Sequence, residues 1–300
     1  MVQAVPSEAL KQALSSVERT SIWVAYERAI ESDRSDALFR DPLAQLMVGQ
    51  GEDELAAIRK QSEDFSSAAN AEKFGVVDGA GRPWEGFHIQ WMAVRTAFID
   101  AWLASSGSPA SGSIGGPYYA ASSPQLVNIG AGMDTRPFRL PCLIGRTVIE
   151  VDSEGVIASK LGVFAEGALG AKPLCESLSA VARDLADPGS PPLPEPLPGH
   201  DARRPTDWLA EGLLPYLPLE AQLRLLAGID NASAPGSRAC LNYMEAPEWM
   251  PTLTPELLAK ALPSWDITHH RFGDATLNFG RVPEGVLSKK LSFAVAVKLQ

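Results

Sequence analysis

Residues 126–152 read LVNIGAGMDTRPFRLPCLIGRTVIEVD, and this stretch decides the fold. One apolar run ends in a Gly-x-Gly turn at Gly130 and Gly132, and a second apolar run ends in Asp152. A carboxylate about twenty residues after a glycine turn is the spacing of a nucleotide-binding β-turn-α-β unit. Glycine also lets the backbone approach a ligand where a Cβ would collide. The stretch therefore predicts two parallel strands, joined by a helix, around a nucleoside site.

The residue at position 135 narrows the choice of ligand. A dinucleotide fingerprint needs a third glycine there, so that the helix packs closely and its first turn holds a pyrophosphate, but this chain has Thr135. A nucleoside without phosphates fits better, and S-adenosylmethionine is the first candidate. A nicotinamide-dependent dehydrogenase is the second, although no Tyr-x-x-x-Lys or similar catalytic pair is recognisable. An ordinary strand-turn-helix is the third.

Composition narrows the class of protein. The 300 residues are 45% hydrophobic and 21% charged, which is typical of a globular chain. No apolar run reaches the roughly 18 residues of a membrane span, and the first residues lack a secretion signal, so we expect a cytoplasmic protein and no membrane partner. The net charge of −10 disfavours nucleic acid. Cys142, Cys175 and Cys240 are spaced neither as a disulfide framework nor as metal ligands, which predicts reduced thiols and no metal.

The first hundred residues have the pattern of a helical cover. Residues 89–102 carry an apolar stripe at i, i+3, i+4 spacing, which predicts a helix. Asp41 precedes Pro42 as the expected N-cap of a short helix that ends at Gly49. Residues 104–124 are rich in Gly and Ser and predict an exposed connection.

Beyond this connection, strand-like runs alternate with helical stretches. Ser153 can cap one of the helices, residues 188–205 form a proline-dense loop, and residues 291–297 alternate as a terminal strand. Such alternation predicts an α/β fold, a Rossmann-like, doubly wound and mostly parallel sheet. We therefore expect all 300 residues to form one domain, with a helical N-terminal cover (1–123) and a cofactor-binding core (124–300).

Acidic residues follow three of the predicted strands. Ligands of an open parallel sheet lie beyond the carboxyl ends of its strands. There Asp152 would hold the ribose hydroxyls of an adenosyl ligand. Asp184 would accept from the adenine amino group, and the backbone N–H of Leu185 would donate to a ring nitrogen.

The amino-acid end of such a ligand carries an ammonium and a carboxylate group, and each needs a partner of opposite charge. Glu211 could face the α-ammonium and Arg95 the α-carboxylate, whereas Arg136 could simply pair with Asp134 or Glu150. The expected cofactor-binding residues are Arg95, Gly130, Ala131, Gly132, Asp152, Asp184, Leu185 and Glu211.

Several blocks of the sequence resemble the leucine carboxyl methyltransferase family and its bacterial small-molecule relatives, including polyketide O-methyltransferases. The blocks are NIGAGMDTRP (128–137), TSIWVA (20–25), DALFRDP (36–42), VRT (94–96) with Asp100, RPTDWLAEGLLPYL (204–217) and NFGR (278–281). The resemblance runs from about Thr20 to the C-terminus. It implies a Rossmann-like S-adenosylmethionine domain with an N-terminal helical cover, and cofactor contacts at the residues named above.

One departure from the family pattern concerns the methyl acceptor. Members that methylate carboxyl groups often carry an arginine directly after the Asp-Leu pair, and this chain has Ala186 there. A carboxylate acceptor is already ionised and needs only an orienting group. Tyr216 fits that place, and Arg271 or Arg281 could replace the missing arginine.

A phenolic acceptor, of pKa about 10, would instead need a base, typically histidine. Adjacent strand residues point to opposite faces, so at most one member of the cluster His269–His270–Arg271 would face the site. The four histidines are His88, His200, His269 and His270. Aromatic residues that could line an apolar pocket, or could be plain core, are Trp84, Phe87, Trp91 and Trp249.

These observations lead to one functional prediction with two alternatives. We expect an S-adenosylmethionine-dependent O-methyltransferase that acts on a small-molecule carboxylate of polyketide type or another secondary metabolite. The expected catalytic residues are Tyr216, His269 and Arg271. The alternatives are a phenol O-methyltransferase with a histidine base and a non-catalytic homologue that only binds the cofactor. The sequence fixes no oligomeric state.

Overall fold

The chain is described here from a computed structural model. The described residues are 15, 18–49, 51–105, 123–166, 171–190, 193, 197–245, 253–288 and 290–299. Most of the predicted connection 104–124, parts of the proline-dense loop, and Trp249 lie outside the described residues.

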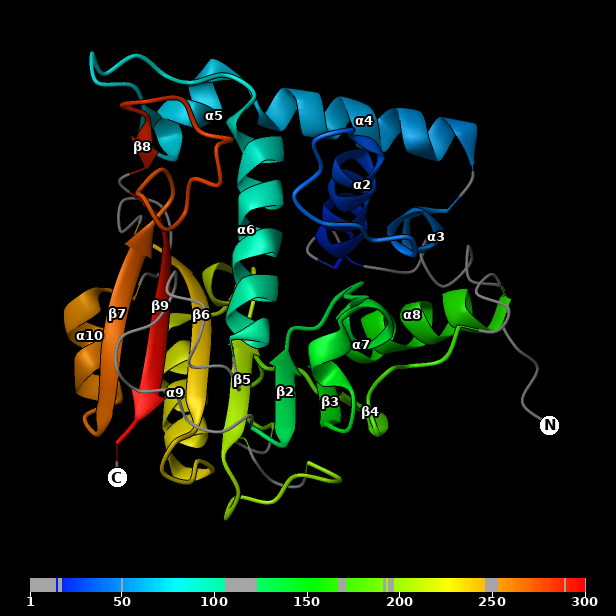
Figure 1. Cartoon of the computed structure of the whole chain (residues 1–300), viewed down its shortest axis with the longest axis vertical. Helices are drawn as coiled ribbons and strands as arrows, with labels where there is room; N and C mark the ends of the chain where they lie inside the picture. The colour runs from blue at the N-terminus through cyan, green and yellow to red at the C-terminus, as the bar shows by residue number, and fades with distance from the viewer. Residues whose placement is uncertain are drawn as a thin grey trace.

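A seven-stranded sheet forms the centre of the molecule (Figure 1). Its strands are β2 (Gln125–Ile129), β3 (Thr147–Asp152), β4 (Ser177–Ala182), β5 (Thr206–Ala210), β6 (Arg238–Met244), β7 (Trp265–Arg271) and β9 (Leu291–Lys298). They lie in the order β4-β3-β2-β5-β6-β9-β7, and β9 runs antiparallel to both of its neighbours. The remaining pairs are parallel. The predicted α/β, mostly parallel sheet is therefore confirmed.

The strand order places a ligand crevice between β2 and β5. The chain moves outward from β2 through β3 to β4 and then returns to β5, on the other side of β2. Ligands of open α/β sheets bind at such a reversal. Ile129 is in register with both Val151 and Ala210, so the glycine turn, Asp152 and Glu211 follow at one level of the sheet.

Helices cover both faces of the sheet and its carboxyl edge. In Figure 1, α6 runs down the near face, α9 and α10 lie behind the sheet, and α2 to α5 lie above the strand ends. The helices are α2 (Thr20–Asp33), α3 (Ala44–Val48), α4 (Glu52–Phe65), α5 (Ala68–Lys73), α6 (Phe87–Ala104), α7 (Arg136–Arg139), α8 (Glu154–Glu166), α9 (Leu219–Asn231) and α10 (Pro255–Ala261), with short 3₁₀ turns η1 (Pro141–Leu143) and η2 (Leu214–Tyr216). None of the helices in the described residues is long and apolar enough to cross a bilayer.

A small second sheet ties the N-terminal helices to the C-terminal part of the chain. It consists of β1 (Val76–Val77) and β8 (Leu287–Ser288), which pair antiparallel. The sequence pattern predicts helix over the first hundred residues, and the two-residue strand β1 is too short for an alternating pattern to reveal.

The prediction that Asp41 caps a helix is wrong. The helix α3 begins at Ala44 and has no side-chain cap, although it ends at Gly49 as predicted. Asp41 is buried and accepts instead from Arg28 Nε (3.0 Å) and Thr135 Oγ1 (2.7 Å). A buried carboxylate needs an ionic partner more than a short helix needs a cap, so Asp41 joins the helical cover to the turn region of the core.

Both faces of the sheet are apolar because helices pack against each of them. All five residues of β5 are buried. Phe293 of β9 packs into the cluster that includes α6, and Ala294 packs into the cluster that includes α9. The predicted alternation of the terminal strand is thus present, but helices bury both of its sides. Each fully buried large apolar side chain stabilises the fold by about 1.5–3 kcal/mol.

Candidate functional site

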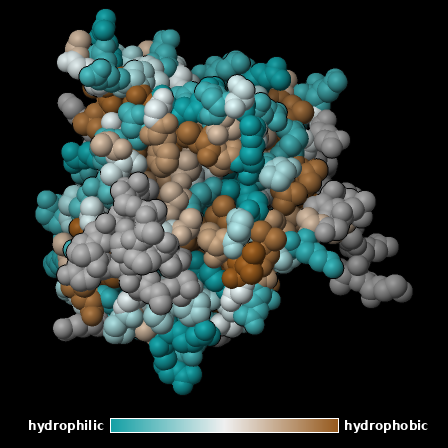
Figure 2. All heavy atoms as spheres, in the orientation of Figure 1, coloured by the Kyte–Doolittle hydropathy of each residue, from teal (hydrophilic) through white to brown (hydrophobic). Residues whose placement is uncertain are grey.

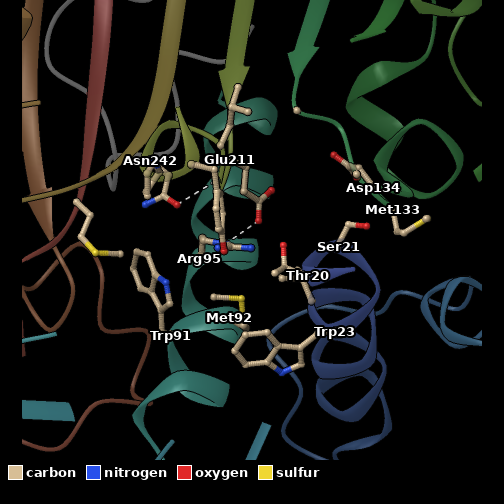
Figure 3. Close-up of a pocket in the computed structure, with 18 of the residues that line it drawn as sticks. Thr20, Ser21, Trp23, Trp91, Met92, Arg95, Met133, Asp134, Glu211 and Asn242 are labelled. Carbon is tan, nitrogen blue, oxygen red and sulfur yellow. Dashed lines mark hydrogen bonds and ion pairs between the residues drawn. The ribbon is translucent and has the colours of Figure 1, made fainter. Parts of the chain in front are cut away.

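A cavity of about 380 Å³ lies at the carboxyl ends of the strands, between the glycine turn and the helices α2 and α6. This volume falls within the roughly 300–1,000 Å³ of small-molecule sites. Figure 3 shows Arg95 and Glu211 between the strand ends and a group of apolar residues, Trp91 and Met92 from α6 and Trp23 from α2. Figure 2, in the orientation of Figure 1, shows hydrophobic residues in the middle of this face of the molecule and hydrophilic residues around them.

The glycine turn has the shape that the sequence predicts. Gly130 and Gly132 have φ values of +70° and +50°, a region that favours glycine. A Cβ at Gly130 would lie 3.0–3.2 Å from side-chain atoms of Leu213, and one at Gly132 would lie 3.1 Å from Cβ of Ser21. Both glycines and Ala131 line the cavity. Side chains at these positions would therefore press on Leu213 and Ser21, which also line the cavity.

Asp152 lines the same cavity and is oriented by the turn. Its Oδ2 accepts from the backbone N–H of Gly132, and its Oδ1 accepts from that of Ser153, both at 2.7 Å. A carboxylate offers about four lone-pair sites, so each oxygen can still accept from a ligand hydroxyl. Burial raises the pKa of Asp152 above its ordinary value and outweighs these two hydrogen bonds, which lower it.

Arg95 and Glu211 contact each other at the side of the cavity. Arg95 Nε donates to Glu211 Oε1 at 2.8 Å, and Arg136 Nη1 donates to Glu211 Oε2 at 2.7 Å. Burial raises the pKa of Glu211, but the two guanidinium groups outweigh it and hold that pKa below its ordinary value. Among the described residues, Arg95 donates through Nε alone, so both its Nη groups are available to a ligand carboxylate.

Arg136 is buried beneath the turn and pairs with Asp134, as one of the sequence alternatives predicted. It also pairs with Asp100 at 2.6 Å. The other alternative, Glu150, pairs with Lys160 instead. Burial raises the pKa of Asp134, but the charges of Arg136, Lys160 and Arg28 together outweigh burial and hold this pKa below its ordinary value. These ion pairs fix the turn relative to α6.

Asp184 and Leu185 lie elsewhere. They line a separate cavity of about 30 Å³ and do not line the larger one. Asp184 is exposed, and its Oδ1 accepts from the backbone N–H groups of Ala186 and Asp187 in its own turn. Leu185 packs against the core. Their contact with adenine stays a prediction.

The three residues expected to act on the acceptor are separated. Tyr216 lines the cavity and is half exposed. His269 and Arg271 do not line it, because β9 separates their strand β7 from β6. His269 Nδ1 lies 2.9 Å from the hydroxyl of Tyr243, and Arg271 is an exposed partner of Glu245 at 3.7 Å. The structure thus brings only Tyr216 to the predicted place.

Two contributions to the site escaped the sequence reasoning. Asn242 lines the cavity and accepts from the backbone N–H of Gly212, which fixes the turn after β5 (Figure 3). His88, one of four candidate bases, lines the cavity and contacts the buried Glu27. Only the helical spacing of His88 and Arg95, two turns apart on α6, could have indicated that both face one cavity. In the described part of the chain, no cluster of His, Cys, Asp or Glu is arranged to hold a metal ion.

The fold and this site define an α/β protein of the Rossmann-like class with a small-molecule cavity at the carboxyl ends of its strands. The sequence profile of the leucine carboxyl methyltransferase family matches residues 21–230. The chain belongs to this family, as the sequence blocks predicted. Membership in its polyketide branch stays a prediction.

Bacterial relatives carry the name "putative S-adenosyl-L-methionine-dependent methyltransferase". The protein of Mycobacteroides abscessus is 37% identical over 230 residues, which are 76% of this chain and 64% of that protein. That of Saccharopolyspora erythraea is 35% identical over 76% of this chain and 68% of its own length. The match thus spans about two thirds of the length of these relatives.

Two solved structures share the fold. A DUF574 family protein from Streptomyces avermitilis superposes with a TM-score of 0.53 over 94% of this chain and 99% of its own, at 15% identity. A protein from Thermobifida fusca titled "putative methyltransferase" gives a TM-score of 0.50 over 92% of this chain and 94% of its own, at 14% identity.

Proposed function

We propose that the protein is an S-adenosyl-L-methionine-dependent O-methyltransferase of a small molecule, and that all 300 residues form one methyltransferase domain. The observation that carries this proposal is that Asp152, the Gly130–Gly132 turn and an aromatic wall border a single cavity. A glycine turn beside a carboxylate with free lone pairs fits a ribose without phosphates. The aromatic wall offers a place for a largely apolar acceptor.

Each part of the methyl donor has a matching group in the cavity. Asp152 would accept from the ribose hydroxyls, and the turn would lie against the ribose and amino-acid portion. The Nη groups of Arg95 would bind the α-carboxylate, and Glu211 would attract the α-ammonium through the lone pairs left by its two arginine contacts. When bound, S-adenosyl-L-methionine supplies an electrophilic methyl group on a positively charged sulfur. The protein then mainly has to align the acceptor oxygen with that methyl.

The acceptor is a carboxylate or a hydroxyl group of a secondary metabolite. For a carboxylate, the Tyr216 hydroxyl would orient the nucleophile. The cations expected to assist it are engaged away from the cavity, since Arg281 pairs with Glu31 at 2.6 Å and Arg271 lies on β7. For a hydroxyl, the cavity supplies His88 as a base. His88 therefore supports a hydroxyl acceptor as an alternative to the carboxylate that the sequence favoured.

Thermal-shift measurements with S-adenosylmethionine, S-adenosylhomocysteine and NADH test the donor. We expect both adenosyl compounds to raise Tm and NADH to leave it unchanged, and the reverse pattern would favour a dehydrogenase. Transfer of a labelled methyl group to a panel of aromatic acids and phenols tests turnover. Binding of S-adenosylmethionine without methyl transfer to any compound of the panel would indicate a non-catalytic homologue.

A further inference from the structure

The wall between α2 and α6 contains a buried histidine–carboxylate pair. His88 lines the cavity, and its Nδ1 lies 3.1 Å from Oε1 and 3.0 Å from Oε2 of Glu27. The two residues are 8% and 1% exposed. Glu27 also accepts from Trp23 Nε1 (2.9 Å) and Ser62 Oγ (2.6 Å). The pair is therefore held by three helices, α2, α4 and α6.

Stability does not account for this pair. The partners of Glu27 other than His88 are neutral, and among the described residues no Lys or Arg forms an ion pair with it. Removing a carboxylate from water costs several kcal/mol, and hydrophobic residues of similar volume often stabilise a core as well or better. An ionisable pair in the wall of a cavity instead indicates a functional role.

The contacts of the ring distinguish its two nitrogens. Because Nδ1 faces the carboxylate, it carries the proton and leaves the lone pair on Nε2. In the described residues, the hydrogen bonds of His88 involve Nδ1 alone. The ring stacks on Trp23 at 4.5 Å and 17° and meets the edge of Phe65 at 4.7 Å, which restricts its rotation. A carboxylate that fixes the tautomer of a histidine is the arrangement that prepares a general base in other enzymes.

The cavity leads from this histidine to the cofactor side. His88, Met92 and Arg95 lie on one face of α6, and all three line the cavity. Seven residues of helix place His88 about 10 Å along the axis from Arg95, whose guanidinium reaches back to Glu211. Trp91 and Met92 line the same cavity between them, and their apolar side chains suit an aromatic acceptor.

We propose that His88, positioned by Glu27, is the general base for the hydroxyl group of an aromatic acceptor. This inference rests on the proposed function and specifies its substrate class. Nε2 takes the hydroxyl proton as the acceptor oxygen forms a bond to the methyl carbon. The carbon–sulfur bond breaks, and its electron pair stays on the sulfur of neutral S-adenosylhomocysteine. Glu27 stabilises the imidazolium until the proton leaves to solvent.

Two probes that share one ring system separate a base from an orienting group. The weak acid 2-naphthol needs deprotonation, whereas 2-naphthoate is ionised at about pH 8. We expect methyl transfer to 2-naphthol, and His88→Gln should lower kcat for it by about 10²–10³-fold while the affinity for S-adenosylhomocysteine stays unchanged in calorimetry. His200→Gln is the matched control, since His200 contacts Thr206 and does not line the cavity. Transfer to 2-naphthoate but not to 2-naphthol, or equal kcat in wild type and His88→Gln, would overturn the role of His88.

Nitrogen-15 NMR of the S-adenosylhomocysteine complex reports which ring nitrogen of His88 carries the proton, and it requires no turnover. With four histidines in the chain, the spectrum of His88→Gln assigns the resonances of His88. We expect a protonated Nδ1, an unprotonated Nε2 that shifts when 2-naphthol is added, and loss of this single tautomer in Glu27→Gln. A protonated Nε2, or no shift with 2-naphthol, contradicts the inference but leaves the proposed function intact. Failure of the wild type to bind either adenosyl compound would instead overturn the proposed function.

Discussion

Arg95 on α6 donates to Glu211 after β5 at 2.8 Å, across 116 residues of sequence. The contact joins the helical cover to the end of a central strand, at the wall of the cavity. Both side chains are largely buried, and Arg136 closes the other side of Glu211. The groups expected to bind opposite ends of an amino acid are thus held in place before a ligand arrives, which reduces the entropy lost on binding.

Replacing Glu211 tests this arrangement. Glu211→Gln removes the carboxylate between Arg95 and Arg136 and makes the cavity wall more positive, which disfavours the sulfonium of S-adenosylmethionine. At an effective dielectric constant of about 20, we expect S-adenosylmethionine, which carries that positive charge, to lose about tenfold more affinity than neutral S-adenosylhomocysteine. Calorimetric titration of both compounds measures the difference. Glu220→Gln, at an exposed residue of α9, is the control. Equal losses for the two compounds would place Glu211 away from the sulfonium.

Gly130→Ala tests the glycine turn. An alanine at this position would have to adopt the positive φ of Gly130, which costs about 1 kcal/mol. Its Cβ would also press on Leu213. Gly145→Ala is the matched control, because Gly145 has φ +74° and no atom within 4 Å of the added Cβ. Both variants should lower Tm, but only Gly130→Ala should weaken S-adenosylhomocysteine binding, by tenfold or more. Similar affinities in the two variants would argue against close approach of the ligand to the turn.

Tyr216→Phe tests the acceptor end of the cavity. Tyr216 is half exposed and lines the cavity, so removal of its hydroxyl should cost little folding free energy. If this group orients the acceptor, turnover should fall by about tenfold, with unchanged S-adenosylhomocysteine affinity. Steady-state kinetics and calorimetry on the same preparations compare the two. Equal effects on turnover and on the affinity for S-adenosylhomocysteine would indicate that Tyr216 contacts the cofactor instead of the acceptor.

Asp207→Asn tests the buried charges of β5. Asp207 is fully buried and pairs with Arg146 at 2.6 Å and with Arg238 at 2.8 Å. Burial raises its pKa, and the two arginines outweigh burial, so the folded-state pKa lies below the ordinary value. The ion pairs of Asp207 therefore contribute their full stabilisation above about pH 4, the pKa of an aspartate in the unfolded chain. This stabilisation is lost as the pH falls through the lower pKa that Asp207 has in the folded chain.

In urea unfolding at pH 7, we expect Asp207→Asn to cost about 3–5 kcal/mol, because it removes the buried carboxylate charge that both guanidinium groups contact. The difference from wild type should shrink below about pH 4. Asp64→Asn, which breaks only an exposed pair with Lys60, should unfold as wild type does. A pH-independent difference would mean that packing rather than charge is responsible.

The parts of the site that the sequence predicted are those encoded locally. Gly130, Gly132 and Asp152 follow consecutive parallel strands, so strand register alone brings them together. The pair of His88 and Glu27 is 61 residues apart and depends on how α2 packs against α6. No spacing pattern within one segment encodes such a contact.

The same reasoning explains why Asp184 and His269 do not line the larger cavity. Asp184 follows a strand, as Asp152 does, but its strand lies at the edge of the sheet, and the side chain stabilises its own turn. His269 is displaced because β9 inserts antiparallel between β6 and β7. Strand order of this kind depends on long-range pairing, which alternating apolar residues do not report.

The pH dependence of cofactor binding follows from Asp152. Because burial raises the pKa of this carboxyl, it should take up a proton at higher pH than an exposed aspartate does. Protonation removes acceptor sites for the ribose hydroxyls. The affinity for S-adenosylhomocysteine should therefore be full at neutral pH and fall on acidification, and Asp152→Asn should abolish this pH dependence. The measurement is calorimetry across the acidic range.

Calorimetric titration of S-adenosylhomocysteine into wild type and Asp152→Ala at neutral pH tests the central claim most directly. Glu154→Ala removes a carboxylate two residues away that does not line the cavity, and it serves as the control. The account predicts one ligand per chain for the wild type and the control. For Asp152→Ala it predicts binding at least a hundredfold weaker, with the chain still folded by circular dichroism. Equal affinity in all three proteins would contradict it.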